Sequence, residues 1–413
     1  MVPFCWIGLA ALDAGQGVEA SGLALLLLLY QLPAVFLLLS RLMQGPVRRP
    51  PLLPLPPTLD LIGSVSVVVP TLNEAHRIAP CLAGLGRQGY EVREILVVDS
   101  RSTDGTVDRV KAAAMRDPRF RLITDDPLPK GWVGRPWALH TGFLHSSSRS
   151  LWVLGIDADT QPQPGLISSL VQAAEAADYD LVSLSPRFVL KQFGELWLQP
   201  ALLMTLVYRF GPAGNQGGMI ERVMANGQCF LCRRTLLETL DGYTTARSSF
   251  CDDVTLARNA AQLGAKVGFW DGSKLLKVRM YEGAIETWRE WGRSLDLKDA
   301  ASFQQTWGDI WFLSAIQALP WLTLPLLLWG LTLGQPHWPV TVALGLNGAL
   351  IAVRIALQGA IAPSYDLTQA DGQQWAFWFS PLADPLATLR IMISALKTPT
   401  QWRGRHYERE IGD

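Results

Sequence analysis

Charge is scarce in this sequence: Asp, Glu, Lys and Arg make up only 17% of its 413 residues. The 36 basic and 36 acidic side chains cancel, so the net charge does not indicate a nucleic-acid-binding surface. Trp is abundant instead, with 16 residues, which is typical of proteins that contact a membrane. The composition therefore favours a membrane-associated protein and argues against nucleic acid as a partner.

Cysteine is also scarce, and its five residues do not predict a disulfide framework. Cys229 and Cys232 form one CxxC inside the apolar run CFLC, and no second pair accompanies it in the sequence. This setting favours small buried hydrophobic side chains over zinc or redox chemistry. The sequence also has no phosphate-binding loop of the GxGxxG or Walker type, so NAD and ATP are not supported as ligands.

Basic residues are missing from residues 1–40, which argues against a signal peptide with a basic start. Residues 23–40 are almost continuously apolar over about the thickness of a bilayer core, and they predict a first transmembrane helix. Arg41, Arg48 and Arg49 follow directly. By the positive-inside rule, these arginines place the next part of the chain in the cytoplasm.

Two further apolar spans lie at about 311–333 and 340–362. Two prolines in the first span should kink it. Arg354 in the second span is costly within a bilayer unless it is paired, reaches the interface or faces protein. Residues 375–396 are apolar but contain charges and prolines, and a full span there would leave the basic tail outside. We therefore expect three spans and an interfacial segment, with the soluble domain and the tail in the cytoplasm.

Between these segments, short β-branched runs alternate with helical stretches, which predicts an α/β fold with a mainly parallel, doubly wound sheet. The expected strands are Val65–Val69, Glu94–Val98, Arg119–Ile123, Leu151–Ile156 and Asp180–Leu184. The apolar stretch Leu196–Phe210 has two interpretations: a core helix, or a helix in the headgroup layer beside the active site. The expected organisation is an N-terminal anchor (1–43, helix about 23–40), a Pro-rich linker (44–60), an α/β domain (61–300) and a C-terminal membrane region (301–413, including the basic tail).

The main chemical signal is Asp157-Ala158-Asp159, which directly follows the apolar run ending at Ile156. Open α/β sheets bind ligands at the carboxyl ends of their strands. Two hard carboxylates at this spacing suit Mg²⁺ or Mn²⁺ that already carries phosphates. Alone, the triplet is weak evidence, since acidic residues after a strand are more often helix caps or solvated turn residues.

Three more polar segments accompany this triplet. Residues 70–75 (PTLNEA) and 97–106 (VVDSRSTDGT) each follow a predicted strand, and Asp252 and Asp253 open a predicted helix that runs to about Gln262. In this order the segments resemble the family-2 glycosyltransferases, whose pattern runs PTxNE, DDGSTDGT, DxD and ED. The resemblance covers roughly Leu61 to Ala300 and implies a GT-A fold, which is Rossmann-like; the transmembrane helices predicted from the apolar spans lie on its N- and C-terminal sides.

Further segments resemble the integral-membrane branch of that family, which glycosylates lipid alcohols and includes hopanoid-associated, ceramide and bacterial carotenoid enzymes. These segments are Gly131–Ala138, Asn226–Gln228, Met280–Tyr281 and Trp402–Tyr407. The stretch Trp291–Asp299 is most similar to the carotenoid 2′-hydroxyl glycosyltransferases.

The resemblance implies roles for individual residues. Asp99 matches the nucleoside-binding aspartate, Asp157 and Asp159 match the metal-binding pair, with Asp159 as the more direct ligand, and Asp253 matches the general base. The other implied positions, which include the neighbour of the base and the donor contacts, are Asp252, Thr71, Glu74, Arg135, Gly227 and Gln228.

Two positions depart from the family pattern. Ser100 replaces the second Asp of the DD pair, so one nucleoside contact is missing or remade. The QxxRW motif is not intact, although Arg289 and Arg293 lie nearby and are candidates for diphosphate contact. A helical basic face that pairs with lipid headgroups explains these two arginines equally well. The departure favours transfer of a single sugar over processive synthesis.

We therefore expect a multi-pass cell-membrane enzyme that moves one sugar from a nucleotide-diphospho-sugar to the hydroxyl of a lipid, in particular a carotenoid, by metal-dependent inverting displacement. Its cofactor would be Mg²⁺ or Mn²⁺. The same chemistry on a polyprenyl phosphate, hopanoid, ceramide or diacylglycerol is the first alternative. The second is a non-catalytic membrane protein that binds a nucleotide-sugar.

Overall fold

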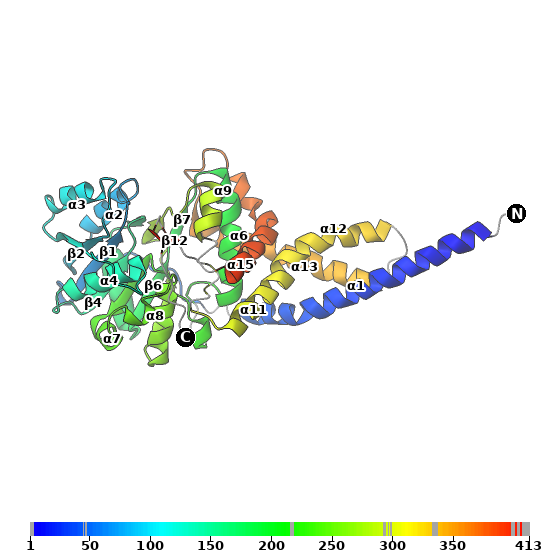
Figure 1. Cartoon of the computed structure of the whole chain (residues 1–413), viewed down its shortest axis with the longest axis horizontal. Coiled ribbons are helices and arrows are strands. Elements are labelled where there is room, and N and C mark those ends of the chain that lie inside the picture. Colours follow the sequence, from blue (N-terminus) through cyan, green and yellow to red (C-terminus); the bar gives the residue numbers. More distant parts are fainter. Residues whose placement is uncertain are drawn as a thin grey trace.

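A sheet-containing head lies at one end of the molecule, and long helices project from the other, as Figure 1 shows for this computed structural model. The structure describes residues 4–43, 45, 48–214, 219–291, 295, 297, 300–332, 338–397, 401–402 and 405–406. The chain starts at the far tip of the longest helix and enters the head only after residue 43. The two ends therefore differ in kind, one being α/β and the other helical.

The head is built on a seven-stranded sheet in the order β3-β2-β1-β4-β8-β6-β9. Its pairs are parallel except where β8 lies antiparallel between β4 and β6, so the predicted, mainly parallel sheet is confirmed. All five predicted strands are present, within two residues at each end. The strands are β1 (Val65–Thr71), β2 (Val92–Asp99), β3 (Phe120–Thr124), β4 (Trp152–Ile156), β6 (Leu181–Ser185), β8 (Cys229–Arg233) and β9 (Val267–Asp271).

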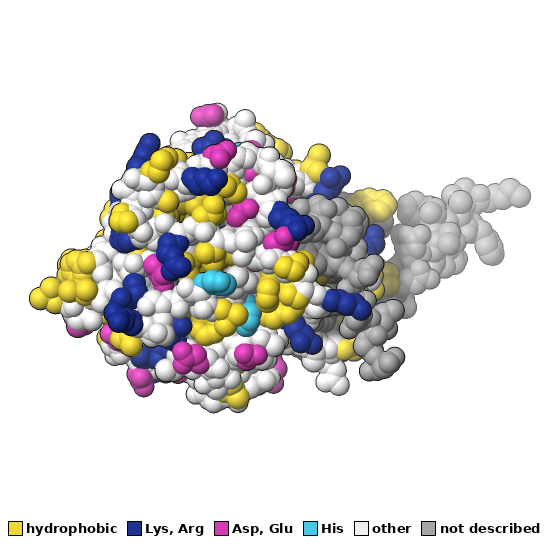
Figure 2. All heavy atoms as spheres, turned by 60° about the vertical axis from the view of Figure 1, so that its left-hand side comes forward, with side chains coloured by type: hydrophobic (Ala, Val, Ile, Leu, Met, Phe, Trp, Pro, Cys, Tyr) yellow, Lys and Arg dark blue, Asp and Glu magenta, His cyan; other side chains and the backbone are white. Residues whose placement is uncertain are grey.

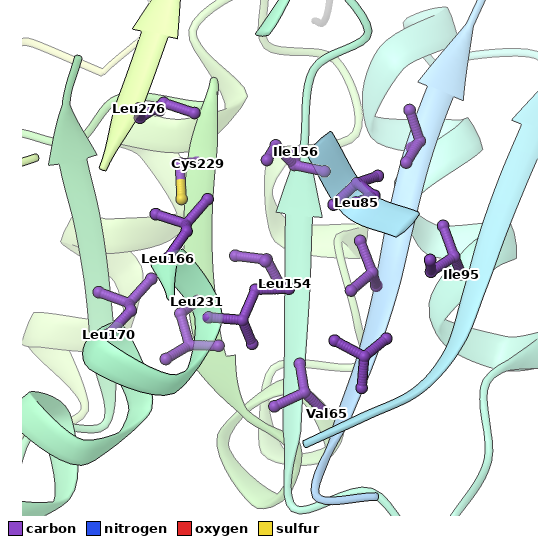
Figure 3. Close-up of a cluster of buried hydrophobic side chains, with 14 of the residues drawn as sticks. Val65, Leu85, Ile95, Leu154, Ile156, Leu166, Leu170, Cys229, Leu231 and Leu276 are labelled. Carbon is purple, nitrogen blue, oxygen red and sulfur yellow. The ribbon is translucent and has the colours of Figure 1, made fainter. Parts of the chain in front are cut away.

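Helices cover this sheet on both faces, as expected for strands whose side chains are buried throughout. Figure 3 shows part of one core layer, where Leu154 and Ile156 of β4 pack with Leu85 and Leu166 of the covering helices. Cys229 and Cys232 are fully buried in β8, which confirms them as small core residues. The covering helices are α2 (Ala79–Gly86), α3 (Thr106–Ala114), α4 (Gly134–His145), α5 (Leu166–Ala176), α7 (Arg234–Thr239) and α8 (Asp252–Gln262).

A second, four-stranded sheet ties the C-terminal region to the head. Its order is β11-β7-β10-β5, with β5 (Thr160–Pro162), β7 (Arg187–Val189), β10 (Leu276–Val278) and β11 (Tyr365–Asp366). Because β11 pairs with β7, the chain returns to the head after its last long helix. The Pro-rich linker is extended, and it is held to the head by Leu52 N–H donating to Asp271 O (2.9 Å) and Leu55 N–H donating to Ser169 Oγ (2.7 Å).

The apolar stretch with two interpretations forms α6 (Phe193–Phe210), which is a core helix. Most of its side chains are buried in a second hydrophobic cluster that also contains residues of the C-terminal helices. The short elements around it are η2 (Leu59–Leu61), η3 (Ile220–Arg222), η4 (Thr244–Ala246), α9 (Gly283–Glu286) and the π-helix η5 (Thr287–Trp291).

Three helices are long and apolar enough to cross a membrane, at Ser21–Leu42, Phe303–Leu331 and Trp338–Ser364. The first belongs to α1 (Phe4–Leu42), which begins well before the predicted span. The second contains α11 (Phe303–Leu313), the π-helix η6 (Ser314–Ala318) and most of α12 (Leu319–Thr332), and its axis turns between α11 and α12 (Figure 1). The third is α13 (Trp338–Ile361) followed by η7 (Ala362–Ser364).

The predicted interfacial segment forms α14 (Trp375–Trp378), η8 (Ser380–Ala383) and α15 (Asp384–Leu396). One side packs on α6, while Trp375, Trp378 and Phe379 are more than half exposed. Of the basic tail, the structure describes Lys397 and two short strands, β12 (Gln401–Trp402) and β13 (Arg405–His406), whereas Arg403 and Arg409 lie outside the described residues. The segment therefore has one side packed on α6 and exposed aromatic side chains elsewhere, and its place at a membrane interface stays a prediction.

Candidate active site

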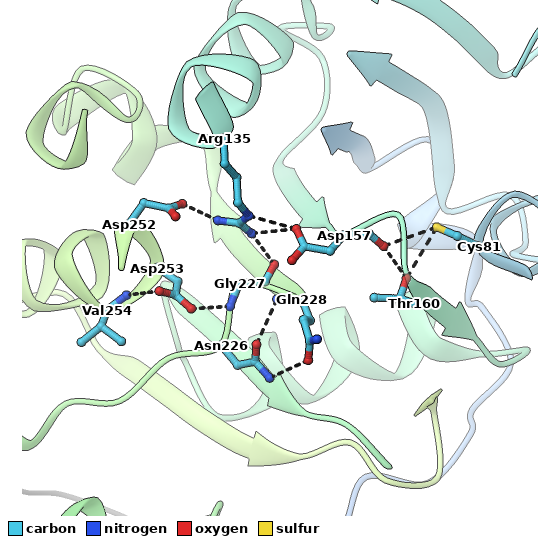
Figure 4. A network of polar contacts seen from close by, with 10 residues as sticks. All are labelled: Cys81, Arg135, Asp157, Thr160, Asn226, Gly227, Gln228, Asp252, Asp253 and Val254. Atoms are coloured by element: carbon cyan, nitrogen blue, oxygen red, sulfur yellow. Dashed lines mark hydrogen bonds and ion pairs between the residues drawn. The ribbon is translucent and has the colours of Figure 1, made fainter. Parts of the chain in front are cut away.

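The acidic residues singled out in the sequence meet at the carboxyl ends of β1, β2 and β4. Asp157 and Asp159 follow β4 directly, and Asp252 and Asp253 form the first turn of α8. Arg135, in the first turn of α4, reaches between the two pairs (Figure 4). Residues that lie more than one hundred positions apart in the sequence thus share one cavity of about 710 Å³.

The Arg135 guanidinium joins the two acidic pairs. Its Nε and Nη2 donate to Asp157 Oδ1 at 3.0 and 2.9 Å, Nη1 donates to Asp252 Oδ2, and Nη2 also donates to Gly227 O at 2.7 Å. A Cβ at Gly227 would collide with this guanidinium, which explains why glycine is needed there. Burial opposes the charge of Arg135, but the carboxylates of Asp157, Asp252 and Asp253 raise its pKa further. The arginine is therefore a fixed positive centre among carboxylates.

Asp253 faces a different neighbour from Asp252. Its Oδ2 accepts from Gly227 N–H at 2.5 Å and its Oδ1 accepts from Val254 N–H at 2.9 Å. Residues 226–228, directly before β8, form a tight turn in which Gln228 N–H donates to Asn226 Oδ1 at 3.1 Å. The two adjacent aspartates thus diverge as expected on a helix, one toward Arg135 and one toward the turn before β8.

Burial has the largest effect on the pKa values of the two aspartates at the start of α8. It raises the pKa of Asp252 to about 6, against the lowering effect of Arg135, and it also raises the pKa of Asp253. The sequence favours ionised carboxylates at a helix N-terminus, and with a pKa of about 6 the Asp252 carboxyl is still mainly ionised at neutral pH. The Asp252 carboxylate is therefore available as an acceptor, but within reach of protonation.

Asp159 has the features of a cation ligand. Its Oδ1 is buried, and no hydrogen-bond partner for that atom occurs among the described residues. Burial, reinforced by the Asp157 carboxylate, raises the pKa of Asp159 to about 7. A buried carboxylate oxygen without a donor fits a divalent cation. Within the described part of the chain no three His, Cys, Asp or Glu side chains cluster as a closed metal site, so such a cation would share this pair with phosphate oxygens.

The residues predicted to bind the nucleoside lie at the carboxyl ends of β1 and β2 and in the loops that follow them. Thr71 Oγ1 donates to Asp99 Oδ1 at 3.2 Å, and Asp99 Oδ2 accepts from Ser102 N–H at 2.9 Å. Glu74 is buried and lies 3.3 Å from Arg77 Nε. A small side cavity of about 50 Å³ is lined by Thr71, Glu74, Asp157 and Asp159, so these loops and the acids share a second cavity.

Two residues of the site were not identified from the sequence. The first is Asp125, which directly follows β3. Ser100, which departs from the family pattern, donates through Oγ to Asp125 Oδ2 at 2.6 Å, so Asp125 supplies a carboxylate where the DD pair lacks one. Arg77 donates to Met280 O at 3.0 Å and lies 3.8 Å from Glu286, which connects the loop after β1 to α9. Asp125 follows a predicted strand and could have been found by that position, whereas Arg77 gave no local signal.

The rest of the large cavity has a mainly apolar lining, which also includes charged side chains such as Arg77, Glu282 and Glu286. Its lining away from the acids comes from α6, the loops before β8 and α8, and the segment after β10, and includes Leu203, Leu206, Met224, Phe250, Ile285 and Leu295. Gly227 and Gln228 line it beside the acids, and Arg289 projects from the exposed side of η5. Arg293 lies outside the described residues. Charged groups and an apolar wall therefore line the same cavity.

Comparison with known proteins agrees with this geometry. Residues 66–241 match the family described as Glycosyl transferase family 2. Among solved structures, the chain is similar to the mannosyltransferase PcManGT from Pyrobaculum calidifontis in complex with GDP-Man and Mn²⁺. The TM-score is 0.53 at 20% sequence identity, and the match covers 91% of this chain and 99% of the other. At this identity the likeness shows a shared GT-A fold.

Two curated relatives come from bacteria. The chain is 24% identical over 235 residues to 4,4′-diaponeurosporenoate glycosyltransferase of Staphylococcus haemolyticus, a match that covers 56% of this chain and 61% of the relative. It is 30% identical over 118 residues to undecaprenyl-phosphate mannosyltransferase of Micrococcus luteus, covering 28% of this chain and 45% of the relative. The chain thus spans less than two thirds of the length of each relative.

Proposed function

We propose that this chain, which carries a family-2 glycosyltransferase domain, transfers one sugar from a nucleotide-diphospho-sugar to the hydroxyl of a membrane lipid, in particular a carotenoid. The observation that carries the proposal is the single cavity whose lining combines four aspartates and Arg135 with an apolar wall that includes Leu203, Leu206 and Phe250. Binding of a soluble, charged donor beside an apolar acceptor requires a cavity with both kinds of lining. A module that only binds a nucleotide-sugar would have no use for the apolar end.

The donor diphosphate is assigned to the end formed by Arg135, Asp157 and Asp159. Arg135 would contact phosphate oxygens as a bidentate donor, and Thr71, Glu74 and Asp99 lie on the side of the nucleoside. Asp157 and Asp159 would hold Mg²⁺ or Mn²⁺, which when bound stabilises negative charge on the departing nucleotide. The buried, unpartnered Oδ1 of Asp159 supports this assignment.

Asp253 is assigned as the general base. In an inverting transfer the acceptor oxygen forms a bond to the anomeric carbon while the bond from that carbon to the diphosphate oxygen breaks, and the proton of the hydroxyl goes to the base. Asp253 lines the cavity beside Gly227 and Gln228, and its carboxylate is oriented by two backbone N–H groups. Asp252 is held by Arg135 and would act on the donor side.

The acceptor is assigned to the apolar wall formed by Leu203, Leu206 and their neighbours. The relative from Staphylococcus haemolyticus, which is a 4,4′-diaponeurosporenoate glycosyltransferase, supports a carotenoid as the acceptor. The relative from Micrococcus luteus, an undecaprenyl-phosphate mannosyltransferase, supports a polyprenyl phosphate as the second candidate. Both candidates are long apolar chains, so both suit the same wall.

The three apolar helices would cross the cell membrane and leave the head on the cytoplasmic side. Arg41, Arg48 and Arg49 directly after the first of these helices support this orientation. Cysteines placed at Pro57 and near Pro336, which lies outside the described residues, should be labelled by an impermeant reagent from opposite sides. Labelling of both from the same side would contradict the multi-pass arrangement.

The activity can be tested with the full-length protein reconstituted in lipid bilayers. The protein would be incubated with nucleotide-sugars, carotenoid and polyprenyl phosphate acceptors, and Mg²⁺ or Mn²⁺, and the extracted lipids analysed by mass spectrometry. We expect an added mass of one sugar on the carotenoid, lost in excess chelator and in Asp159→Ala. Asp108→Ala removes an exposed carboxylate from α3 and should leave transfer unchanged. Full transfer in chelator would refute the metal assignment.

A further inference from the structure

Four arginines from distant segments converge where the first long helix meets the head. Arg41 lies in the last turn of α1, Arg209 in the last turn of α6, Arg222 at the end of η3 and Arg258 in α8. Arg41 lies over the ring of Phe312 of α11, 4.3 Å from its centroid, and Figure 1 shows the end of α1 beside α11. Since Arg41 ends an apolar helix of membrane-spanning length, the cluster stands at the depth of the lipid headgroups in the proposed arrangement.

The two inner arginines are bound to backbone carbonyls of the head. Arg209 Nε donates to Thr205 O at 3.0 Å. Arg258 donates from Nε to Val223 O at 3.2 Å and from Nη2 to Glu221 O at 2.6 Å. Both side chains are almost completely buried, so these guanidiniums fix the local fold and are poorly placed to reach a ligand.

The two outer arginines are different. Arg41 Nη1 donates to Tyr208 O at 2.7 Å, and Arg222 Nη2 donates to Arg209 O at 2.9 Å, so they lie side by side on consecutive carbonyls at the end of α6. The Nε of Arg41 is buried, and no hydrogen-bond partner for it occurs in the described part of the chain. An unpaired buried donor of this kind is costly, and it points to a missing acceptor.

The charges around these two arginines are not balanced. Neither forms an ion pair with a carboxylate of the described residues, and Asp309, the nearby acid, lies 4.0 Å from Arg209. Burial lowers the pKa of Arg222, and Asp309 offsets this only in part. The partial negative charge at the end of α6 favours the cations, but by only about half an elementary charge. An anion placed between Arg41 and Arg222 would supply the missing charge and acceptors.

We propose that Arg41 and Arg222 bind the phosphate group of an anionic phospholipid in the leaflet against which the head lies. Guanidinium groups match phosphate oxygens as bidentate donors, and the cytoplasmic leaflet carries the negatively charged lipids. The proposal rests on the proposed membrane placement but not on sugar transfer. The lipid would hold the end of α1 against α6, whose other face lines the large cavity.

Native mass spectrometry of the full-length protein released from bilayers would test this lipid site. The bilayers would contain phosphatidylcholine with or without phosphatidylglycerol, and no donor or acceptor. Wild-type protein should retain phosphatidylglycerol in preference to phosphatidylcholine. Arg222→Gln should lose about tenfold of that preference, as expected for one charge-assisted hydrogen bond, and Arg222→Lys should lose part of it. Arg149→Gln removes an equal charge from an exposed loop of the head and should behave as wild type.

Several results would overturn the lipid assignment. Retention of phosphatidylglycerol by Arg222→Gln at the level of Arg149→Gln would remove Arg222 from the site, provided that the variant still binds nucleotide. Displacement of the lipid by millimolar inorganic phosphate would show that the site takes a free anion. Retention of neither lipid by the wild type would overturn this proposal, whereas a failure of sugar transfer alone would leave it standing.

Discussion

Two buried arginines, Arg135 in the head and Arg354 in the helical end, have opposite surroundings. Arg354 donates to Asp384 at 2.7 and 3.1 Å and to Gln358 Oε1 at 2.8 Å, so one cation meets one anion. Arg135 pairs with both Asp157 and Asp252, and Asp253 adds a third carboxylate nearby. The first group is electrically complete, whereas the second has an excess of negative charge.

This difference separates a structural pair from a binding site. The Arg354–Asp384 pair joins α13 to α15, and Gln317 extends it by donating to Asp384 Oδ1 at 3.2 Å and to Ala201 O of α6 at 3.0 Å. Both carboxylate oxygens of Asp384 therefore have donors within the protein. The acids around Arg135 line a cavity, and Asp159 keeps a buried oxygen without a donor among the described residues. An excess of carboxylates next to an open space is what a cation and a diphosphate require.

The comparison also extends to the surface. Figure 2 shows acidic and basic side chains mixed over the face of the head, with hydrophobic atoms scattered between them. By contrast, the long helices expose rows of leucine, such as Leu25, Leu29 and Leu32 of α1. The head is therefore suited to water and the helices to lipid, which agrees with the different roles of the two arginines.

The largest effect is expected at the base. Asp253→Asn keeps the size and one of the two backbone hydrogen bonds, since its amide NH2 cannot accept from the second N–H, and it removes the proton acceptor, so single-turnover transfer should fall by ~10²–10⁴. Donor affinity, measured by calorimetry, should stay close to that of the parent. Asp252→Asn should instead weaken donor binding, because it disturbs Arg135. Transfer by Asp253→Asn near the parent rate would place the base elsewhere.

The next largest effect is expected for the Arg354–Asp384 ion pair. Arg354→Met leaves Asp384 buried without its partner, and we expect a loss of about 3–5 kcal/mol in stability. Thermal unfolding in bilayers, followed by Trp fluorescence, would measure the change. The double variant Arg354→Met/Asp384→Leu removes both charges and should recover most of the loss. If the double variant is no more stable than the single one, the pair is not the source of the effect.

Much of the fold could be predicted because it depends on local patterns. The five predicted strands and the start of α8 follow from apolar runs that end in polar turns. The antiparallel β8 was not predicted, because an apolar run such as CFLC carries no information on direction. The pairing of β11 with β7 was also not predicted, since it joins residues far apart in the chain.

The candidate site could be predicted in part for the same reason. Asp157, Asp159, Asp252 and Asp253 stand at ends of elements, where the sequence pattern is informative. The bond from Ser100 to Asp125 and the link from Arg77 to α9 depend on tertiary packing. The partner of Arg354 was likewise open, because a sequence shows that a buried charge needs a partner but not which residue supplies it.

A moderate effect is expected on pH dependence. Burial raises the pKa of Asp252 to about 6, so the carboxyl is protonated below that pH and ionised above it. In saturating Mg²⁺, which would keep Asp159 ionised, transfer at limiting donor should therefore fall as the pH drops through about 6. Arg135 lowers the pKa of Asp252, so Arg135→Gln should move this limb of the profile to higher pH. An unchanged limb in Arg135→Gln would assign it to another group.

The smallest effect is expected in a neutral polar group between the apolar helices. Gln31 of α1 donates to Asn347 Oδ1 of α13 at 2.9 Å and to Ala315 O in η6 at 2.9 Å, and Asn347 donates back to Gln31 Oε1 at 3.1 Å. The π-turn of η6 alters the usual helical pairing at this point and makes a carbonyl accessible to Gln31.

This group should contribute far less than the charged pair. Hydrogen bonds between membrane helices couple by only about 0.6 kcal/mol on average, because the polar groups find other partners when the helices separate. A double-mutant cycle of Gln31→Leu and Asn347→Leu, read by thermal unfolding in bilayers, should give a coupling of about that size. A coupling as large as that of Arg354 and Asp384 would mean that neutral and charged pairs stabilise this helical end equally. The charge balance around Arg354 would then be less important for stability than its burial.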